Sequence, residues 1–324
     1  MEQNILLSVM AIIIGFGLLV WGAERFVHGA AAIAKNLGVS SLIIGLTVVG
    51  IGTSAPEILI SIVASSQGNP ALAVGNALGS NITNIALVLG ITAIVMPLTV
   101  KSETLQREYP IMFIIMLVAL MLVMDNHLGQ MDGLILISGL FIMLYWMIQQ
   151  GRKQKRDPME KEFDQEIPKI SNQKAFLWFA IGLVLLIISS RGLVWGSVNI
   201  AKAAGISDLV IGLTIVAIGT SLPELAASIM SALKKEHDIA IGNIIGSSMF
   251  NLLVVFSIPG LMSPHVIDSS ILERDFPFMI GLSIALFIMA YGFKGQGRVN
   301  RFEGSLLLGG YFAYMTVLYY TAVI

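Results

Sequence analysis

The chain alternates between long apolar runs and short polar breaks along its whole length. Ten of these runs are long enough to cross a hydrocarbon core of about 30 Å. They lie at residues 5–24, 42–65, 71–95, 109–124, 132–150, 175–198, 208–232, 239–260, 276–293 and 303–323. The pattern predicts an all-α polytopic membrane protein with ten transmembrane helices.

Composition supports this class. Of the 324 residues, 56% are hydrophobic and 12% are charged, and the mean hydropathy of +0.85 excludes a soluble domain of this size. The first run is too long for a removable signal peptide and lacks a basic start and a small-residue cleavage pattern, so we expect Met1 to be the mature start. The absence of cysteine excludes disulfides and thiolate metal sites.

Lysine and arginine predict the orientation. Sixteen of them fall in the loops on one side of the ten runs and three on the other. Because cytoplasmic loops carry the excess of positive charge, we expect a multi-pass protein of the cell (inner) membrane with both termini outside the cytoplasm.

The sequence contains an internal repeat. "LIIGLTVVGIGTSAPE" from Leu42 aligns with "LVIGLTIVAIGTSLPE" from Leu209, and "AVGNALGSNITN" from Ala73 with "AIGNIIGSSMFN" from Ala240. Residues 42–91 and 209–258 share 22 identities in 50 positions without a gap. The chain therefore divides into a first five-helix repeat at 1–148, a charged cytoplasmic linker at 149–174 and a second five-helix repeat at 175–324.

A repeat of five helices has an odd number of crossings. The second copy must then enter the membrane from the opposite side, and equivalent helices run antiparallel. Two inverted-topology repeats are the architecture of secondary transporters, whose substrate site lies at the repeat interface near the bilayer midplane.

Each repeat carries one carboxylate in the middle of its second span, Glu57 and Glu224, whereas the other charged residues lie at or near span ends. An unpaired charge at this depth costs at least about 3 kcal/mol, so such residues serve a pathway or a bound ion. Pro56 and Pro223 lack the N–H of a regular helix and should loosen the turn, which frees backbone oxygens.

Neutral oxygen ligands surround both carboxylates in the sequence. Hydroxyls precede each glutamate by three and four residues, and the next span of each repeat has a serine and an asparagine four residues apart, on one helix face. The predicted ligands in the first repeat are Thr53, Ser54, Glu57, Ser80 and Asn84, and in the second Thr220, Ser221, Glu224, Ser247 and Asn251. An all-oxygen set suits Ca²⁺ or Na⁺ rather than zinc or copper.

Structural interpretations compete with this one. A single proline kink with a protonated glutamate would be ordinary packing, but packing does not require the same ionisable group twice at the expensive depth. Asn84 and Asn251 are also suited to hydrogen bonds between helices, and Ser80 and Ser247 to close packing. We interpret Asn76 and Asn243 as structural.

The motifs "GTSAPE" with "GSNITN" and "GTSLPE" with "GSSMFN" resemble the paired repeats of the Ca²⁺/cation antiporter superfamily, the sodium/calcium exchangers. The whole-chain pattern, without a large cytoplasmic domain, looks like the bacterial YrbG-like branch. The resemblance implies that the ten residues above line the ion sites, with backbone carbonyls near Gly50 and Ala217. It also implies that the first and sixth helices slide against the other helices. Some relatives carry an acid in place of Asn84 or Asn251, and its absence here argues against a K⁺ site.

We therefore expect an antiporter that exchanges Ca²⁺ against Na⁺ by alternating access, with Ca²⁺/H⁺ exchange at the same carboxylates as the alternative. The lipid bilayer and the ions Ca²⁺, Na⁺ or H⁺ are the expected partners, without a cofactor or nucleic acid. An intramembrane hydrolase using Ser54 or Ser221 lacks a base at membrane depth. A passive channel lacks a ring-symmetric filter.

Overall fold

The computed structural model describes residues 2–37, 41–100, 107–153, 170–203, 217–291 and 297–323. In this part of the chain, each predicted span lies mainly in helix; residues 208–216 of the seventh span and 292–293 of the ninth lie outside the described residues. The helices before the linker are α1 (Glu2–Leu37), α2 (Ser41–Ile44), α3 (Gly50–Thr53), α4 (Ala55–Ser66), α5 (Pro70–Ile82), α6 (Leu89–Val95), α8 (Glu108–Leu122) and α9 (Gln130–Lys153). Those after it are α11 (Asn172–Ala203), α13 (Ala217–Thr220), α14 (Leu222–Leu233), α15 (His237–Phe250), α16 (Ser257–Met262), α17 (Phe276–Ala290) and α18 (Arg301–Val323).

The first helix is longer than its predicted span of 5–24, because α1 continues to Leu37. Its added turns contain Ala30, Ala31 and Ala34, which favour helix and are buried. They pack in one apolar cluster with Phe179 of α11. Packing against a neighbouring helix therefore extends α1 beyond the apolar run that predicted it.

The helix is interrupted just before each motif proline, where the sequence predicted a loosened turn. The helix formed by residues 45–53 and α4 meet at an angle of 48° at Ser54. Pro56 is in the first turn of α4, and Pro223 in the first turn of α14, where a missing N–H costs nothing. A break at Ser221 separates α13 from α14 in the same way. Each glutamate thus lies in the first turn of a new helix.

Among the described residues, four stretches are π-helical, a feature that the sequence pattern did not predict. They are η1 (Gly45–Val49), η2 (Thr83–Val88), η4 (Asn251–Val255) and η5 (Ile271–Asp275). The segments η2 and η4 begin at or beside Asn84 and Asn251, the same position of each repeat. Single π-helical turns often mark functional sites.

In the described part of this helical protein, two short β ribbons join the repeats. Strand β1 (Leu98–Val100) pairs antiparallel with β4 (Gly297–Val299), and β2 (His127–Leu128) with β3 (His265–Val266). The registers match: Leu98 faces Val299 in one ribbon, and its repeat equivalent His265 faces Leu128 in the other. The ribbons are pseudo-symmetric, and each pairs one repeat with the other.

The last helix of each repeat also packs on the opposite repeat. Gly304 of α18 lies against Gly90 of α6, and a β-carbon there would be 2.7 Å from the Gly90 oxygen. At the equivalent position, a β-carbon on Gly133 of α9 would be 2.9 Å from the Ser257 oxygen of α16. Because the last helix of each repeat packs on the opposite repeat in this way, the two repeats are intertwined.

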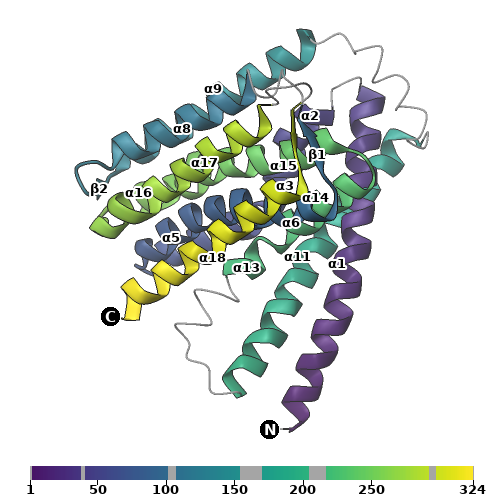
Figure 1. Cartoon of the computed structure of the whole chain (residues 1–324), viewed down its shortest axis with the longest axis horizontal. Helices are drawn as coiled ribbons and strands as arrows, with labels where there is room; N and C mark the ends of the chain where they lie inside the picture. The colour runs from purple at the N-terminus through teal and green to yellow at the C-terminus, as the bar shows by residue number, and fades with distance from the viewer. Residues whose placement is uncertain are drawn as a thin grey trace.

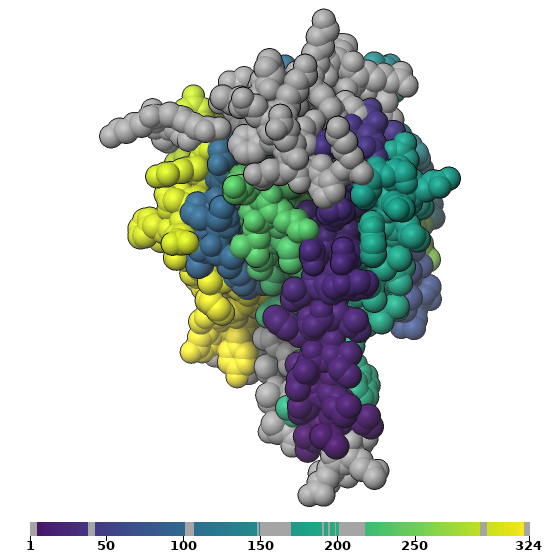
Figure 2. Space-filling view, turned by 90° about the vertical axis from the view of Figure 1, so that its right-hand side faces the viewer, coloured from purple at the N-terminus to yellow at the C-terminus, as the bar shows by residue number. Residues whose placement is uncertain are grey.

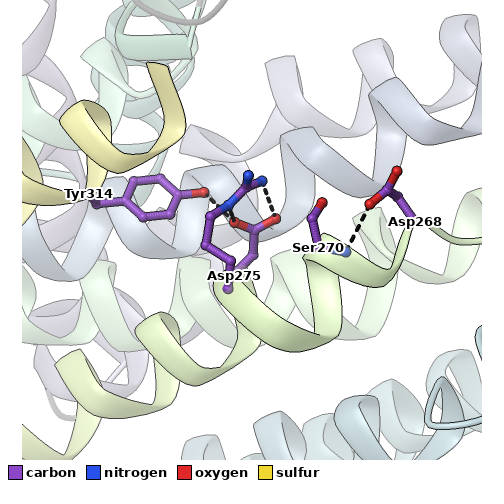
Figure 3. Close-up of polar contacts among 5 residues, drawn as sticks. Asp268, Ser270, Asp275 and Tyr314 are labelled. Carbon is purple, nitrogen blue, oxygen red and sulfur yellow. Dashed lines mark hydrogen bonds and ion pairs between the residues drawn. The ribbon is translucent and has the colours of Figure 1, made fainter. Parts of the chain in front are cut away.

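A polar cluster fixes the start of α17 to α18 (Figure 3). Asp275 accepts hydrogen bonds from Arg274 Nε at 2.7 Å and from the Tyr314 hydroxyl at 2.8 Å. In the preceding loop, Ser270 donates its backbone N–H to Asp268, and this contact with Ser270 holds the pKa of Asp268 below its ordinary value. The cluster is far along the chain from the motif glutamates and anchors the α17–α18 hairpin.

Helices α1 and α11 form a long antiparallel pair at one side of the molecule (Figure 1), and Figure 2 shows them lying against each other on that face. Gly29 of α1 contacts Phe179 and Ala175, whereas Gly196 near the other end of α11 contacts Ser8. Apolar side chains of the pair belong to a smaller apolar cluster, which also contains Ile44, Val49, Ala227 and Ile239 of the bundle. The pair therefore packs against the bundle through this smaller cluster.

We predict that Gly29→Ala destabilises the fold, because the new β-carbon would meet the Phe179 nitrogen and lie 2.7 Å from the Ala175 oxygen. Overpacking of this kind costs about 1–3 kcal/mol. Gly17, in the same helix, is the matched control, since a β-carbon there has nothing within 4 Å. Gly17→Ala should be neutral or stabilising by up to about 1 kcal/mol. Thermal unfolding of both purified variants checks this; equal melting temperatures would contradict the close α1–α11 contact.

Candidate functional site

The two motif glutamates are fully buried and close to each other. Glu57 and Glu224 both have 0% exposure, and the charge of Glu224 acts on the Glu57 carboxylate. Each lies in the first turn of its helix, α4 or α14. The positive end of a helix dipole stabilises a carboxylate there. The helix breaks thus create an environment for negative charge inside an apolar bundle.

Each carboxylate lies beside a hydroxyl of the opposite repeat. Ser54 Oγ donates to Glu224 Oε1 at 3.3 Å, and Thr220 lies beside the Glu57 carboxylate. The sequence placed these hydroxyls on the same helix face as the glutamate of their own repeat. The structure shows that they also reach the glutamate of the other repeat.

A second set of contacts joins α3 to α15. Thr53 Oγ1 is 3.3 Å from Ser247 Oγ, and Ser247 Oγ donates to the Gly50 carbonyl oxygen at 3.3 Å. Thr53 and Ser247 also lie near the Glu224 carboxylate. Two hydroxyls, a carboxylate and a backbone carbonyl from both repeats therefore share one small region.

Asn84 and Asn251 lie at the π-helical segments, with 1% and 0% exposure. η2 packs against α14, and η4 packs against α4, so each asparagine is carried by a segment that contacts the glutamate helix of the other repeat. Ser80 on α5 and Ser221 before α14 are also buried. Neither serine is hydrogen-bonded to another of the ten predicted ligands in the described part of the chain.

Buried oxygen and nitrogen atoms without hydrogen-bond partners gather at this site. Among the described residues they include Glu57 Oε1 and Oε2, Glu224 Oε2, Ser221 Oγ and both amide atoms of Asn84 and Asn251. Native proteins leave few buried polar groups unpaired, because each costs about 1–3 kcal/mol. A bound cation would satisfy the oxygens, and the donor set fits a hard cation such as Ca²⁺ or Na⁺.

The site differs from a conventional metal cluster of acidic or imidazole ligands. Within the described ranges, no group of three or more His, Cys, Asp or Glu could hold a metal ion. Two carboxylates with neutral oxygens give two formal negative charges. Such a site suits weak, reversible binding of an ion better than permanent retention, because ligand charge sets cation affinity.

The structure gives Asn76 and Asn243, which we interpreted as structural, specific partners that the sequence did not predict. Asn76 Nδ2 donates to the Glu57 carbonyl oxygen at 3.1 Å, and Asn243 Nδ2 to the Glu224 carbonyl oxygen at 3.2 Å. Each asparagine is 19 residues after its glutamate. Their identical position in both copies of the "GN" motif was the available signal.

Comparisons with known proteins identify the family and the fold of the chain. A family model described as "Sodium/calcium exchanger protein" matches residues 7–149 and 174–320. The chain is 44% identical to "Putative antiporter CaxA" of Alkalimonas amylolytica, over 97% of this chain and 99% of the relative. It is 39% identical to "Inner membrane protein YrbG" of Escherichia coli (strain K12), over 98% and 99% of the two chains.

A solved structure has the same fold. The sodium-calcium exchanger NCX_Mj, in a crystal soaked with zero Na⁺ and Ca²⁺, matches with a TM-score of 0.83 and 31% identity, over 97% of this chain and 99% of that chain. This likeness confirms the predicted architecture of ten helices in two inverted repeats.

We predict that Ca²⁺ raises the melting temperature of the protein in Na⁺-free buffer. An ion that binds only the folded state at about 100 times its Kd stabilises that state by about 2.7 kcal/mol. The matched control is the Glu57→Gln/Glu224→Gln double variant, which removes both charges and keeps the side-chain size. A Ca²⁺ shift of equal size in the double variant would contradict an ion site at these carboxylates.

Proposed function

The chain belongs to the sodium/calcium exchanger family, and on that premise we propose that it exchanges Ca²⁺ against Na⁺ at the buried Glu57–Glu224 site. Membership establishes a membrane cation antiporter rather than an enzyme. The proposal adds the driving ion and the ligands. The ligands are the ten predicted residues, Thr53, Ser54, Glu57, Ser80 and Asn84 with Thr220, Ser221, Glu224, Ser247 and Asn251.

One observation carries the proposal. Two carboxylates from opposite repeats lie together in the bundle, and three of their four oxygens lack a hydrogen-bond partner. The fourth accepts a single bond from Ser54. Carboxylate oxygens that are buried without partners are available to coordinate a cation, and the neighbouring hydroxyls and amide oxygens complete an oxygen shell.

Charge explains how the two fluxes are coupled. With both glutamates ionised, the ion-free site carries two negative charges, which are costly to move through an apolar barrier. One Ca²⁺ neutralises the site, and three Na⁺ leave one positive charge. Only ion-loaded states then cross, and a 3:1 exchange moves net charge.

The α1–α11 pair provides a candidate moving part. It meets the bundle through the smaller apolar cluster, and both helices contact α14, which carries Glu224. Helix α11 also contacts α3 and α13, on either side of the site. Displacement of this pair would change access to the site and leave the intertwined helices in place.

The same premise extends to topology and organisation. We propose residues 1–148 and 175–324 as the two repeats, joined by the linker 149–174; the two segments matched by the family model support these bounds. The excess of lysine and arginine on one side supports an inner-membrane protein with both termini outside the cytoplasm. The relative named as an inner membrane protein is consistent with that location.

Transport by purified protein tests the driving ion. Proteoliposomes loaded with Na⁺ and diluted into Na⁺-free buffer should take up ⁴⁵Ca²⁺, because outward Na⁺ movement drives the exchange. Parallel vesicles carry a proton gradient or a K⁺ gradient instead. Uptake driven by the proton gradient alone would replace Na⁺ with H⁺ as the counter-ion.

Variants provide the control for this assay. Glu57→Gln and Glu224→Gln should each reduce Na⁺-driven uptake at least about 100-fold, since each removes half of the charge that binds Ca²⁺. Uptake that ignores every gradient would indicate a passive channel. Uptake that persists in both variants would overturn the proposed site.

A further inference from the structure

Asn243 is a fully buried amide that joins the two repeats beside the candidate site. Its Nδ2 atom donates to the Glu224 carbonyl oxygen at 3.2 Å and to Ser228 Oγ at 2.9 Å, both on α14. Its Oδ1 atom lies 2.9 Å from Thr53 Oγ1 of α3, in the first repeat. Asn243 itself is on α15 and has 0% exposure.

Hydrogen-bond chemistry fixes which atom is the donor in each of these Asn243 contacts. A backbone carbonyl only accepts, so the atom of Asn243 that faces the Glu224 carbonyl must be the NH₂ group. Oδ1 then faces Thr53, and because an amide oxygen also only accepts, Thr53 must be the donor. The amide orientation follows from its partners and not from a choice between two flips.

This direction matters because a hydroxyl has one proton. A hydroxyl that coordinates a cation must turn a lone pair to the ion and give its proton to an acceptor elsewhere. Thr53 has two competing acceptors, the Val49 and Gly50 carbonyl oxygens at 3.1 and 3.4 Å, but Asn243 Oδ1 is the closest at 2.9 Å. With the Thr53 proton on Asn243, the neighbouring Ser247 hydroxyl is the donor in the Thr53–Ser247 contact or donates to the Gly50 carbonyl.

We propose that Asn243 is a positioning residue for ion binding: it accepts the Thr53 proton and thereby turns the Thr53 and Ser247 oxygens to the transported cation. Asn243 does not contact the ion and acts through these two hydroxyls. The same amide holds the Glu224 backbone, so it aligns a carboxylate of one repeat with a hydroxyl of the other. This inference rests on the proposed function and adds a specific residue to it.

A double-mutant cycle separates this role from simple packing. The readout is the Kd for Na⁺-displaceable ⁴⁵Ca²⁺ binding to the purified full-length protein. Thr53→Val and Asn243→Leu should each weaken binding about tenfold, and the double variant also about tenfold rather than about 100-fold, because both changes remove the same oriented hydroxyl.

Two controls distinguish positioning from structural support. Ser228→Ala removes the other side-chain partner of Asn243. It weakens the hydrogen-bonded contact between α14 and α15 but should change the Kd less than about twofold. Thr53→Ser keeps the hydroxyl, so Asn243→Leu should still weaken binding about tenfold when it is added to this variant. Melting temperatures identify any variant that is misfolded. If Asn243→Leu does not fold, the Kd values of the Ser228→Ala and Thr53→Ser variants still provide a readout.

The outcomes separate the two levels of the argument. Wild-type protein without Na⁺-displaceable ⁴⁵Ca²⁺ binding would overturn the proposed function. Two results with a wild type that binds would overturn the positioning role and leave the exchanger proposal in place. In one, the Thr53→Val/Asn243→Leu double variant raises the Kd about 100-fold. In the other, Ser228→Ala raises the Kd as much as Asn243→Leu does.

Discussion

Burial of two acidic side chains in the middle of a membrane bundle is the constraint that organises this protein. An isolated charge at that depth costs at least about 3 kcal/mol, and a second carboxylate adds repulsion. The local structure offsets this cost with helix breaks at Ser54 and Ser221, which place Glu57 and Glu224 in the first turns of new helices. Hydroxyls from the opposite repeat lie beside both carboxylates. Among the described residues, three of the four carboxylate oxygens have no hydrogen-bond partner, and the proposed cation would supply it.

The inverted duplication explains why these groups meet. One repeat supplies a kinked helix with a carboxylate, and only an oppositely oriented copy can present the same features to it across a pseudo-twofold axis. The scaffold maintains this relation by exchanging parts between repeats. The two β ribbons have matching registers, and Gly133 and Gly304 make equivalent close contacts with the opposite repeat. The site therefore lies inside an intertwined frame.

The sequence predicted the features that depend on composition and repetition. Apolar runs located the helices, the duplicated motif located the paired glutamates, and the prolines located the breaks. Other features leave no such pattern. A π-helical turn at Asn84 or Asn251 changes one hydrogen-bond register without a compositional signature. The ribbons have strands of two or three residues, whose pairing depends on partners far away in the chain. The extension of α1 to Leu37 depends on packing against α11.

The two copies of the motif are alike in sequence but not in contacts. Glu224 accepts a hydrogen bond from Ser54, whereas both oxygens of Glu57 lack one, and the equivalent serine, Ser221, has an unpaired hydroxyl. Asn243 is fully buried, and its counterpart Asn76 is half-buried. An inverted pair in identical local states would present the same access to both membrane faces. The contacts of the two described copies differ, so the pseudo-twofold symmetry of the fold is broken at the two carboxylates.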